Sequence, residues 1–368
     1  MEQAMVDRDT LTRMLELARW APSGDNTQPW RFEIVDEGLV LIHGFDTRDQ
    51  VVYDFEGHAS QIAHGALLET LRIAASGLGC ATSWRLRPES SDRQPVFELH
   101  VSRAPGGAAD PLFPYIERRV VQRRPMRTTP LTPEQRRALA AAAGESHEVR
   151  FFESFAERVT VARLLWDNAY IRLTCPEAFE VHREVIEWGA RYSTDRIPEQ
   201  AVGVDPLTAR LMRWVMQSWG RVDFFNKYLM GTVAPRIQLD VLPALGCAAH
   251  LFVVARRPPS SMLDYVEAGI AMQRVWLTAH ALGLHLQPEM TPVIFKWYAT
   301  ASRSLSVKPG IDDRVRLLSG RLAALLGNDA ASGLVVMCRV GSSAPPASRS
   351  TRKALADLMT NRSGTELR

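Results

Sequence analysis

The order of structural signals along the chain is the feature that most restricts its fold, because one series of elements occurs twice. The first series comprises a helix at 11–18, strands at 31–35 and 39–42, a helix at 60–76 and a strand at 97–101. The second series comprises a helix starting at 132–135, strands at 151–152 and 251–255, a helix at 268–282 and a strand at 334–340. Helical spacing of apolar residues distinguishes the helices from the short β-rich runs. The repetition predicts an α+β fold made of two sheet-plus-helix copies.

The length of 368 residues exceeds that of one compact domain, so we expect the repetition to set the domain organisation. We predict a first copy at 1–103, a linker at 104–115 with turn-forming Pro and Gly, and a second copy at 116–368. Both long helices end close to glycines, Gly79 and Gly283, which are typical helix stops. Two unrelated amphipathic helices would give the same pattern, and this alternative stays open.

The second copy contains an insertion at 158–232 that has no counterpart in the first. Its pattern is helical and it is rich in large aromatic side chains. Two interpretations remain: the aromatic residues form core and interface, or the insertion is a lid that covers a planar ligand.

Charge and hydropathy exclude several classes of protein. A net charge of +3 gives no basis for nucleic-acid binding. The apolar stretches are far shorter than the ~20 residues of a membrane span, and the first ten residues have no apolar signal segment. We therefore expect a soluble, cytoplasmic protein that binds neither nucleic acid nor membrane.

The cysteines and histidines do not indicate a metal site. Cys80, Cys175, Cys247 and Cys338 lie far apart and form no CxxC pair, so we interpret them as buried packing residues in a reducing compartment; a nucleophile is the alternative. His58 and His64 point in different directions around a helix. The motifs of classical hydrolases, Rossmann dehydrogenases and P-loop NTPases are missing from the sequence.

Three polar segments could bind a ligand. Residues 21–30 form a Pro-Ser-Gly turn with hydroxyl and amide donors, suited to a heterocycle or sugar chain, although an ordinary helix-to-strand loop has the same composition. Residues 118–127 contain five arginines, the side chain best suited to grip a phosphate; a solvated charged face is the alternative. The basic tail at 349–353 is either a further phosphate contact or a solvated terminus.

The segment APSGDNTQPW at 21–30 resembles the flavin-binding loop of the nitroreductase family of FMN-dependent oxidoreductases, whose pattern is close to A-P-S-x-x-N-x-Q-P-W. Residues 187–206 resemble the central region of the longer, two-copy members, the Acg-like and MoeY-like proteins. Residues 277–288 resemble the helix and turn that lie under the isoalloxazine. The resemblance implies a nitroreductase-like fold, arranged as a tandem pseudo-dimer, with FMN as cofactor.

The resemblance also implies the residues that hold the flavin. Arg119 and Arg123 match the family's arginine stretch at the FMN phosphate, although Val120 and Val121 replace its usual hydroxyl residue, and Arg349 or Arg352 returns from the tail. A backbone N–H of Glu289 or Met290 is expected at flavin N5 or O4, because Pro288 has none. The loop residues expected at the cofactor are Pro22, Ser23, Gly24, Asn26 and Gln28.

One complete flavin site is expected for each chain. The first copy has no arginine-rich segment before its first helix, and the second copy has only a short stretch at 143–148 in place of the Pro-Ser loop. Because these two losses are complementary, we expect one FMN in the cleft between the copies. The pseudo-dimeric chain would act as a monomer, with further homodimerisation left open.

The flavin carries the redox chemistry, so no catalytic side chain is expected. The resemblance implies hydride transfer from NAD(P)H through flavin N5 to a small planar acceptor, or oxidation of a biosynthetic intermediate. Trp214, Phe224 and Tyr228 are the residues expected to shape the acceptor pocket. The alternative functions are a flavin-sequestering protein without turnover and a scaffold that has lost the flavin.

Overall fold

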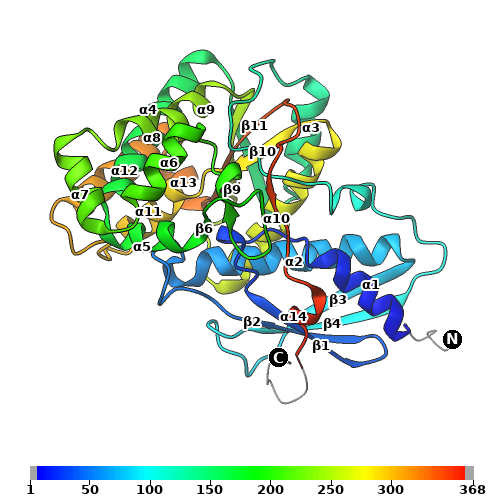
Figure 1. Ribbon diagram of the computed structural model, residues 1–368. Helices are drawn as coiled ribbons and strands as arrows, with labels where there is room; N and C mark the ends of the chain where they lie inside the picture. Colours follow the sequence, from blue (N-terminus) through cyan, green and yellow to red (C-terminus); the bar gives the residue numbers. More distant parts are fainter. Residues whose placement is uncertain (1–5, 361–368) are drawn as a thin grey trace.

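Two four-stranded antiparallel sheets, joined through a pair of long helices, form the centre of the molecule (Figure 1). The structure is a computed structural model, and residues 6–360 are described. It confirms the predicted α+β class, with helices and antiparallel sheets in both halves.

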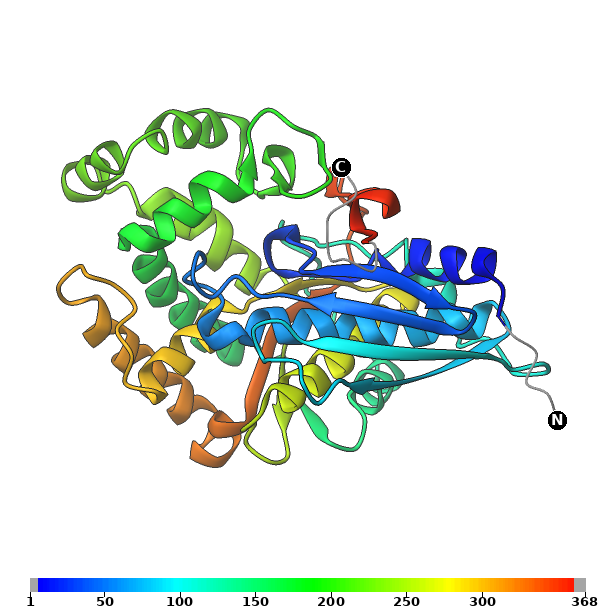
Figure 2. The same ribbon diagram turned by 90° about the horizontal axis from the view of Figure 1, so that it is seen from below.

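The first sheet has one covered and one open face. Its elements are α1 (Arg8–Ala18), β1 (Trp30–Asp36), β2 (Leu39–Gly44), α2 (His58–Gly77), β3 (Cys80–Leu86) and β4 (Val96–Arg103). The strand order is β1-β2-β4-β3. Figure 1 places α1 and α2 on the same side of this sheet, and Figure 2 looks at its outer face. Strand β3 alternates between partly covered and exposed residues, as expected when one face meets water.

Local sequence signals account for the predicted elements of this half. Asp7 caps α1, because its carboxylate accepts a bond of 2.8 Å from the Thr10 N–H. The predicted inward residues of α1, Leu11, Met14, Leu15 and Ala18, are all buried. The prediction missed β3, in which the exposed Ala81 and the partly covered Thr82 interrupt the alternation of apolar and polar residues.

The second sheet is covered on both faces. It contains β5 (His147–Phe152), β9 (Ala249–Ala255), β10 (His285–Pro288) and β11 (Leu334–Gly341), with α3 (Pro133–Ala142) and α10 (Met262–Ala281) alongside. Every residue of β11 is buried, and so is all of β9 except Ala255. The capping box of Thr132 and Gln135 starts α3, as its sequence predicts.

The two sheets have the same arrangement of strands. The order of the second sheet is β5-β9-β11-β10. In both sheets, the strands that come first, second, fourth and third along the chain therefore lie side by side in that order. Helices α3 and α10 then correspond to α1 and α2. This agreement supports the predicted tandem arrangement; the duplication and the boundaries at 103 and 116 stay predictions.

The long helices α2 and α10 also share polar contacts at their interface. The amide Nε2 of Gln273 donates to Thr70 Oγ1 at 2.9 Å, and the Arg274 guanidinium lies 2.7 Å from the Glu69 carboxylate. The segment expected as a linker is anchored to both helices, since Asp110 contacts Arg72 at 2.7 Å and Arg274 at 3.2 Å.

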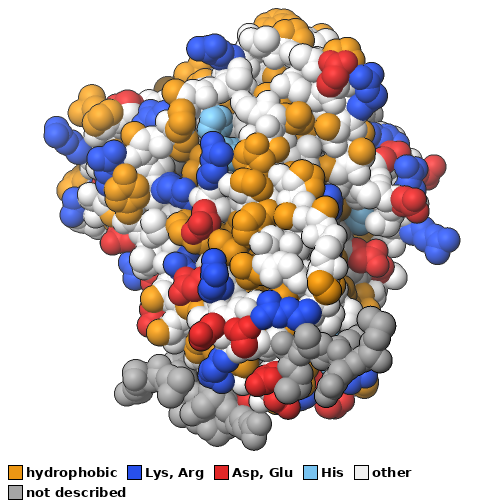
Figure 3. All heavy atoms as spheres, turned by 90° about the vertical axis from the view of Figure 1, so that its right-hand side faces the viewer, with side chains coloured by type: hydrophobic (Ala, Val, Ile, Leu, Met, Phe, Trp, Pro, Cys, Tyr) orange, Lys and Arg blue, Asp and Glu red, His pale blue; other side chains and the backbone are white. Residues whose placement is uncertain are grey.

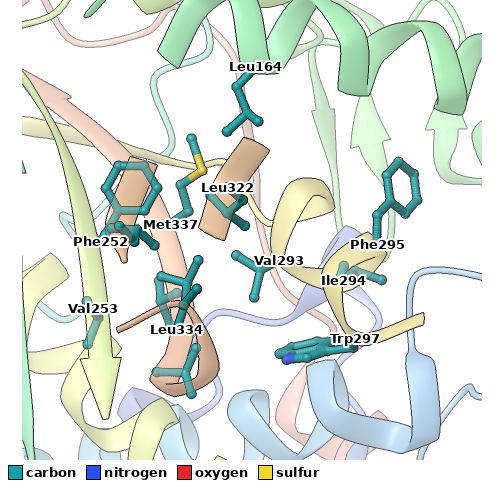
Figure 4. Close-up of a cluster of buried hydrophobic side chains, with 14 of the residues drawn as sticks. Leu164, Phe252, Val253, Val293, Ile294, Phe295, Trp297, Leu322, Leu334 and Met337 are labelled. Carbon is teal, nitrogen blue, oxygen red and sulfur yellow. The ribbon is translucent and has the colours of Figure 1, made fainter. Parts of the chain in front are cut away.

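A helical layer covers the outer face of the second sheet and is longer than the predicted insertion. Its helices are α4 (Phe155–Thr174), α5 (Pro176–Val185), α6 (Pro206–Val215), α7 (Trp219–Tyr228), α8 (Val233–Arg236), α9 (Leu242–Leu245), α11 (Thr291–Thr300), α12 (Ile311–Leu326) and α13 (Asn328–Gly333). Figure 4 shows side chains of α4, α11 and α12 meeting those of β9 and β11 in one buried cluster. The sequence patterns did not identify α11–α13.

The C-terminal tail crosses from the second sheet to the first (Figure 1). It contains β12 (Arg349–Ser350) and α14 (Leu355–Leu358), and it reaches the edge strand β1, where Met359 pairs with Phe32. One short strand of the helical region, β7 (Tyr192–Ser193), pairs with β12 of the tail. Two others, β6 (Ile186–Glu187) and β8 (Ile197–Pro198), pair with each other. The tail therefore links both sheets with the insertion.

The cysteines have the predicted burial. All four cysteines are buried and free of disulfides. On the face shown in Figure 3, acidic and basic side chains are interspersed. None of the helices described between residues 6 and 360 is long and apolar enough to cross a membrane.

Candidate functional site

The Pro-Ser loop, residues 21–30, connects α1 to β1 in an unusual backbone conformation. Asp25, Asn26 and Gln28 have positive φ angles of 49°, 66° and 52°, which is uncommon for residues other than glycine. The Ser23 hydroxyl accepts a bond of 2.9 Å from the Gln28 N–H and so closes the turn. Conformations of this kind persist only where the surroundings hold them, and they concentrate at binding sites.

The two amide side chains of the Pro-Ser loop are bonded to other parts of the chain. Gln28 Nε2 donates to the Thr194 carbonyl at 2.9 Å, and Gln28 Oε1 accepts from the Lys353 N–H at 3.0 Å. Asn26 Nδ2 donates to the Thr351 carbonyl at 3.2 Å. The side chains expected at the flavin therefore hold the C-terminal tail and the loop around residue 194 against the Pro-Ser loop.

Three of the predicted phosphate ligands, Arg119, Arg349 and Arg352, converge beside Trp20; we call them the arginine cluster. The Arg119 side chain donates to the Trp20 carbonyl at 2.8 Å, and Arg352 donates to the Ala21 carbonyl at 3.1 Å. The Arg349 guanidinium lies 4.8 Å from the centre of the Trp20 ring. Residues far apart in sequence are thus gathered at the end of α1.

The other side of Arg119 packs on the second copy. Its guanidinium lies 4.3 Å from the centre of the Trp276 ring of α10, which gives a cation–π contact. Its N–H backbone group donates to the Tyr115 carbonyl at 3.0 Å. The cluster consequently lies between α1 of the first copy and α10 of the second.

The electrostatics of the arginine cluster favour an anion. Burial, and after it the charges of Arg352 and Arg349, hold the pKa of Arg119 well below its ordinary value. Burial and Arg349 lower the pKa of Arg352 to about 9. The pKa of Arg349 is also lowered by burial, against the opposing influence of Glu117. No carboxylate within residues 6–360 is recorded in an ion pair with these three side chains.

Arg123, the fourth predicted phosphate ligand, lies elsewhere. Its NH1 donates to the Ala201 carbonyl at 3.3 Å. Burial lowers its pKa to about 10, while the nearby Asp25 carboxylate opposes this shift. The structure therefore associates Arg123 with Asp25 of the Pro-Ser loop and not with the arginine cluster.

A buried charged triad supports the segment that follows β10. His250 Nδ1 lies 2.8 Å from Glu289, and Arg339 NH1 lies 2.9 Å from the other oxygen of the same carboxylate. His250 Nε2 lies 3.0 Å from the Ala244 carbonyl, so both ring nitrogens face acceptors. Arg339 NH2 donates to the Arg123 carbonyl at 2.8 Å. The triad thus joins two segments that were predicted to touch the cofactor.

The charge state of the triad follows from these contacts. Burial alone would lower the pKa of His250, but the Glu289 carboxylate raises it to about 10. Burial alone would raise the pKa of Glu289, but His250 and Arg339 hold it below its ordinary value. The histidine is therefore an imidazolium near neutral pH, with both nitrogens donating.

The backbone bonds near Glu289 distinguish between the two N–H groups, of Glu289 and Met290, that were expected at a flavin ring. The Glu289 N–H donates to the Met337 carbonyl at 2.7 Å, so this group is committed to the sheet. Met290, the N-cap of α11, remains the candidate donor of the pair, directly after Pro288 and Glu289.

A tyrosine–histidine pair near the Pro-Ser loop was not anticipated. Tyr53 Oη lies 2.9 Å from His182 Nε2, which joins the first copy to α5 of the insertion. Burial and then Arg172 lower the pKa of His182 to about 3, and burial raises the pKa of Tyr53. Both side chains are therefore neutral near pH 7. Their separation in sequence gave no signal for the pairing.

The aromatic residues expected at the acceptor pocket lie on the surface of the helical layer. Trp214 is 48% exposed on α6, while Phe224 and Tyr228 are 52% and 71% exposed on α7. Figure 1 shows α7 at the left edge of the molecule, away from the first sheet. The structure thus does not bring these three residues to the Pro-Ser loop or the arginine cluster.

The arginine cluster and the Pro-Ser loop meet at the end of α1. The sequence model of the nitroreductase family matches residues 2–42, which include the Pro-Ser loop. The putative NAD(P)H nitroreductase acg of Mycobacterium tuberculosis (strain ATCC 25618 / H37Rv) is 32% identical over 94 residues, which are 25% of this chain and 28% of that protein. Over these segments the chain is similar to the nitroreductase family.

A second relative extends the similarity over more of the chain. The uncharacterized protein MT1398 of Mycobacterium tuberculosis (strain CDC 1551 / Oshkosh) is 24% identical over 277 residues, 74% of this chain and 37% of that protein. The chain therefore spans little more than a third of this curated relative and less than a third of acg.

Two solved structures are similar over about two thirds of the chain. The FMN-dependent nitroreductase NfnB from Mycobacterium smegmatis, in complex with NADPH, is 15% identical with a TM-score of 0.35, and the match covers 66% of this chain and 93% of that one. A nitroreductase-like family protein from Bacillus cereus is 11% identical with a TM-score of 0.33, and the match covers 68% and 95%.

Proposed function

We propose that the chain is a flavin-dependent oxidoreductase that binds FMN between its two copies and passes hydride from NAD(P)H to a small acceptor. The arginine cluster carries this proposal, because the buried Arg119 and the half-buried Arg349 and Arg352 converge beside Trp20, and no carboxylate among the described residues pairs with them. Arginine holds phosphate through paired N–H donors. An FMN phosphate would supply the charge that this cluster needs.

The donors of the cluster fit a phosphate group. The Nε atoms of Arg119 and Arg349 are buried and have no recorded hydrogen-bond partner. Unpaired buried donors are costly, and a phosphate oxygen would satisfy them. The bonds from Arg119 and Arg352 to carbonyls at the end of α1 hold the guanidiniums in place.

Other predicted contacts fit a flavin less directly. Asn26 and Gln28 are occupied by chain carbonyls, so we assign them to shaping the Pro-Ser loop and not to the ring. We propose that Pro22, Ser23 and Gly24 are the loop residues that contact the cofactor, and that the Met290 N–H is the donor near the ring. Arg123 faces Asp25, and we propose that it orients the loop.

The flavin, when bound, would accept hydride from the nicotinamide and deliver it to the acceptor. The chain's own residues would bind the phosphate through the arginine cluster, support the Met290 segment through the buried triad and exclude water from the loop. Tyr53 and His182, both neutral, can hold a proton at the Tyr53 oxygen beside the site.

One FMN for each chain remains our proposal. The counterpart of the Pro-Ser loop between α3 and β5 spans only residues 143–146. It is too short to repeat the ten-residue signature of residues 21–30. Two flavins for each chain in a titration would contradict this stoichiometry.

A visible absorption spectrum of the purified full-length chain tests the proposal. We expect a flavin band that is released as FMN by heat, or that appears on adding FMN. Anaerobic mixing with NADPH should then bleach the band within seconds. A chain that neither carries nor binds FMN would refute the proposal.

Flavin sequestration without turnover is the second candidate function. It is favoured by the tail and the loop around residue 194, which both bond to the Pro-Ser loop. A bound flavin that NADPH fails to reduce, but that dithionite reduces, would establish this alternative over the first.

A further inference from the structure

The largest apolar side chains on the surface gather in one part of the fold. Of the fourteen large hydrophobic residues recorded as exposed in residues 6–360, nine lie between Leu207 and Leu242. We call residues 206–230, which comprise α6, α7 and the two residues after them, the helical arm. Monomeric proteins rarely leave such surface without a function.

The apolar stripe of α6 faces outward. Leu207, Leu211 and Trp214, spaced by four and three residues, occupy one face of the helix and are 75%, 49% and 48% exposed. On the opposite side, Ala209 is the buried residue of this helix. A surface helix ordinarily directs its apolar stripe to the core, so α6 presents to solvent the side that would be expected to be covered.

Helix α7 continues this surface. Phe224 and Tyr228 are spaced by four residues and are more than half exposed, with ring centres 5.2 Å apart. Phe225 connects the two helices, since its ring lies 5.9 Å from Trp214 and 6.2 Å from Phe224. Leu229 and Met230 extend the surface beyond α7.

The helical arm is also basic. It contains Arg210, Arg213, Arg221 and Lys227 against one acidic residue, Asp223. Asp223 lies 2.6 Å from Lys227 and 3.5 Å from Lys308, so its charge is compensated. Arg210 and Arg213 are exposed beside the apolar stripe of α6.

We propose that the helical arm docks on the surface of an anionic lipid bilayer. Exposed Trp, Phe, Leu and Tyr side chains can enter the headgroup region, while neighbouring arginines attract acidic lipid. A two-fold contact between copies would place the arginines of one arm against those of the other, which opposes self-association. This peripheral contact needs no membrane-spanning helix, and it departs from the expectation that the chain does not bind membrane. It does not rest on the proposed flavin chemistry.

Sedimentation with extruded vesicles tests the proposal on the full-length chain. We expect binding to vesicles of phosphatidylcholine and phosphatidylglycerol at least roughly ten-fold stronger than to phosphatidylcholine alone, and weaker binding at high salt. Absence of binding to the anionic vesicles would overturn the proposal.

Two double variants separate the arm from general surface hydrophobicity. Leu211→Ser with Trp214→Ser should reduce binding to anionic vesicles by roughly ten-fold or more. The matched control, Phe155→Ser with Leu317→Ser, removes side chains that are 67% and 58% exposed outside the arm, and binding should persist. Equal losses in both variants would refute the assignment to the arm.

Arg210→Gln with Arg213→Gln tests the charge without altering the apolar stripe. This variant should lose the preference for acidic lipid and retain its thermal unfolding profile. Light scattering of the same proteins addresses the competing occupant: a dimer that the Leu211→Ser and Trp214→Ser changes abolish, without vesicle binding by the unmodified chain, would assign the surface to self-association.

Discussion

Gly65 of α2 and Gly269 of α10 are reciprocal contacts at the crossing of the two long helices. A Cβ on Gly65 would overlap the carbonyl oxygen of Val266, and a Cβ on Gly269 would overlap the carbonyl oxygen of Ile62. Ile62 lies three residues before Gly65, and Val266 lies three residues before Gly269. Each glycine therefore faces the carbonyl of the residue three positions before the other glycine. The neighbouring polar contacts are related in the same way. Glu69 contacts Arg274 and Thr70 contacts Gln273, so each contact joins the fourth residue after one glycine to the fifth residue after the other. This local two-fold relationship supports the predicted tandem arrangement.

Gly65→Ala should destabilise the chain by several kcal/mol, because the new methyl group meets backbone and not a movable side chain. Denaturant unfolding measures the change. Gly320→Ala is the matched control: Gly320 is also inside a helix, α12, but has open space around its Cβ position. That control should gain about 0.5–1 kcal/mol of stability. Similar losses in both variants would show that the helix crossing is not tightly packed.

Arg119→Ala should weaken FMN binding by roughly ten- to hundred-fold, as expected for loss of a charge-assisted hydrogen bond. Isothermal titration of flavin-free protein measures this affinity. Arg118→Ala provides the control, because Arg118 is exposed next to the cluster and packs on Tyr115. Affinity unchanged in Arg119→Ala would remove the phosphate assignment, even if the chain still bound flavin elsewhere.

The arginine cluster should also respond to anions without a flavin. Inorganic phosphate should raise the thermal unfolding temperature of the unmodified chain, because it relieves repulsion among Arg119, Arg349 and Arg352. The rise should be smaller in Arg352→Gln than in Arg31→Gln, a variant on β1. An equal phosphate effect in both variants would indicate non-specific salt stabilisation.

Gln28→Ala should loosen the tail over residues 351–353 and the loop around residue 194. The substitution removes the bonds to the Thr194 carbonyl and the Lys353 N–H together. Hydrogen exchange followed by mass spectrometry should become faster in these segments, while α2 stays protected. Gln50→Ala, in an outer turn of the first copy, is the control. Unchanged exchange in the tail would mean that the other contacts, such as β7–β12 pairing and the Asn26 bond to Thr351, are sufficient to hold it.

Local elements were predictable from the sequence because their signals are local. The apolar spacing of Leu11, Met14, Leu15 and Ala18 defines α1, and Thr132 with Gln135 starts α3. Strand β3 was missed because Ala81 on its open face and Thr82 on its covered face interrupt the alternation on which strand prediction depends.

Contacts between distant residues were only partly predictable. The convergence of Arg119 and Arg352 was expected from a family resemblance, since no local pattern relates positions so far apart. His250 gave a weak signal, as one polar residue in an apolar strand must find a partner, but the sequence did not identify Glu289 and Arg339. The outward stripe of α6 has ordinary helical spacing, and only the packing of the helical layer determines which side is covered.

The buried triad should make stability depend on pH in a defined direction. Folded His250 keeps its proton up to about pH 10, whereas an unfolded histidine releases it near its ordinary value of 6.5. The stabilisation is therefore complete below about pH 6.5 and is lost as the pH rises towards 10, at no more than ~1.4 kcal/mol per pH unit. We expect the difference in unfolding free energy between the unmodified chain and His250→Gln to shrink over this range.

Lys296, whose burial lowers its pKa to about 8, contributes the opposite slope but is present in both proteins and cancels. His100→Gln, at an exposed position of β4, should give a difference that does not change in this way. A constant difference for His250→Gln from pH 7 to 10 would mean that the histidine is neutral in the folded chain, and that Glu289 is held by Arg339 alone.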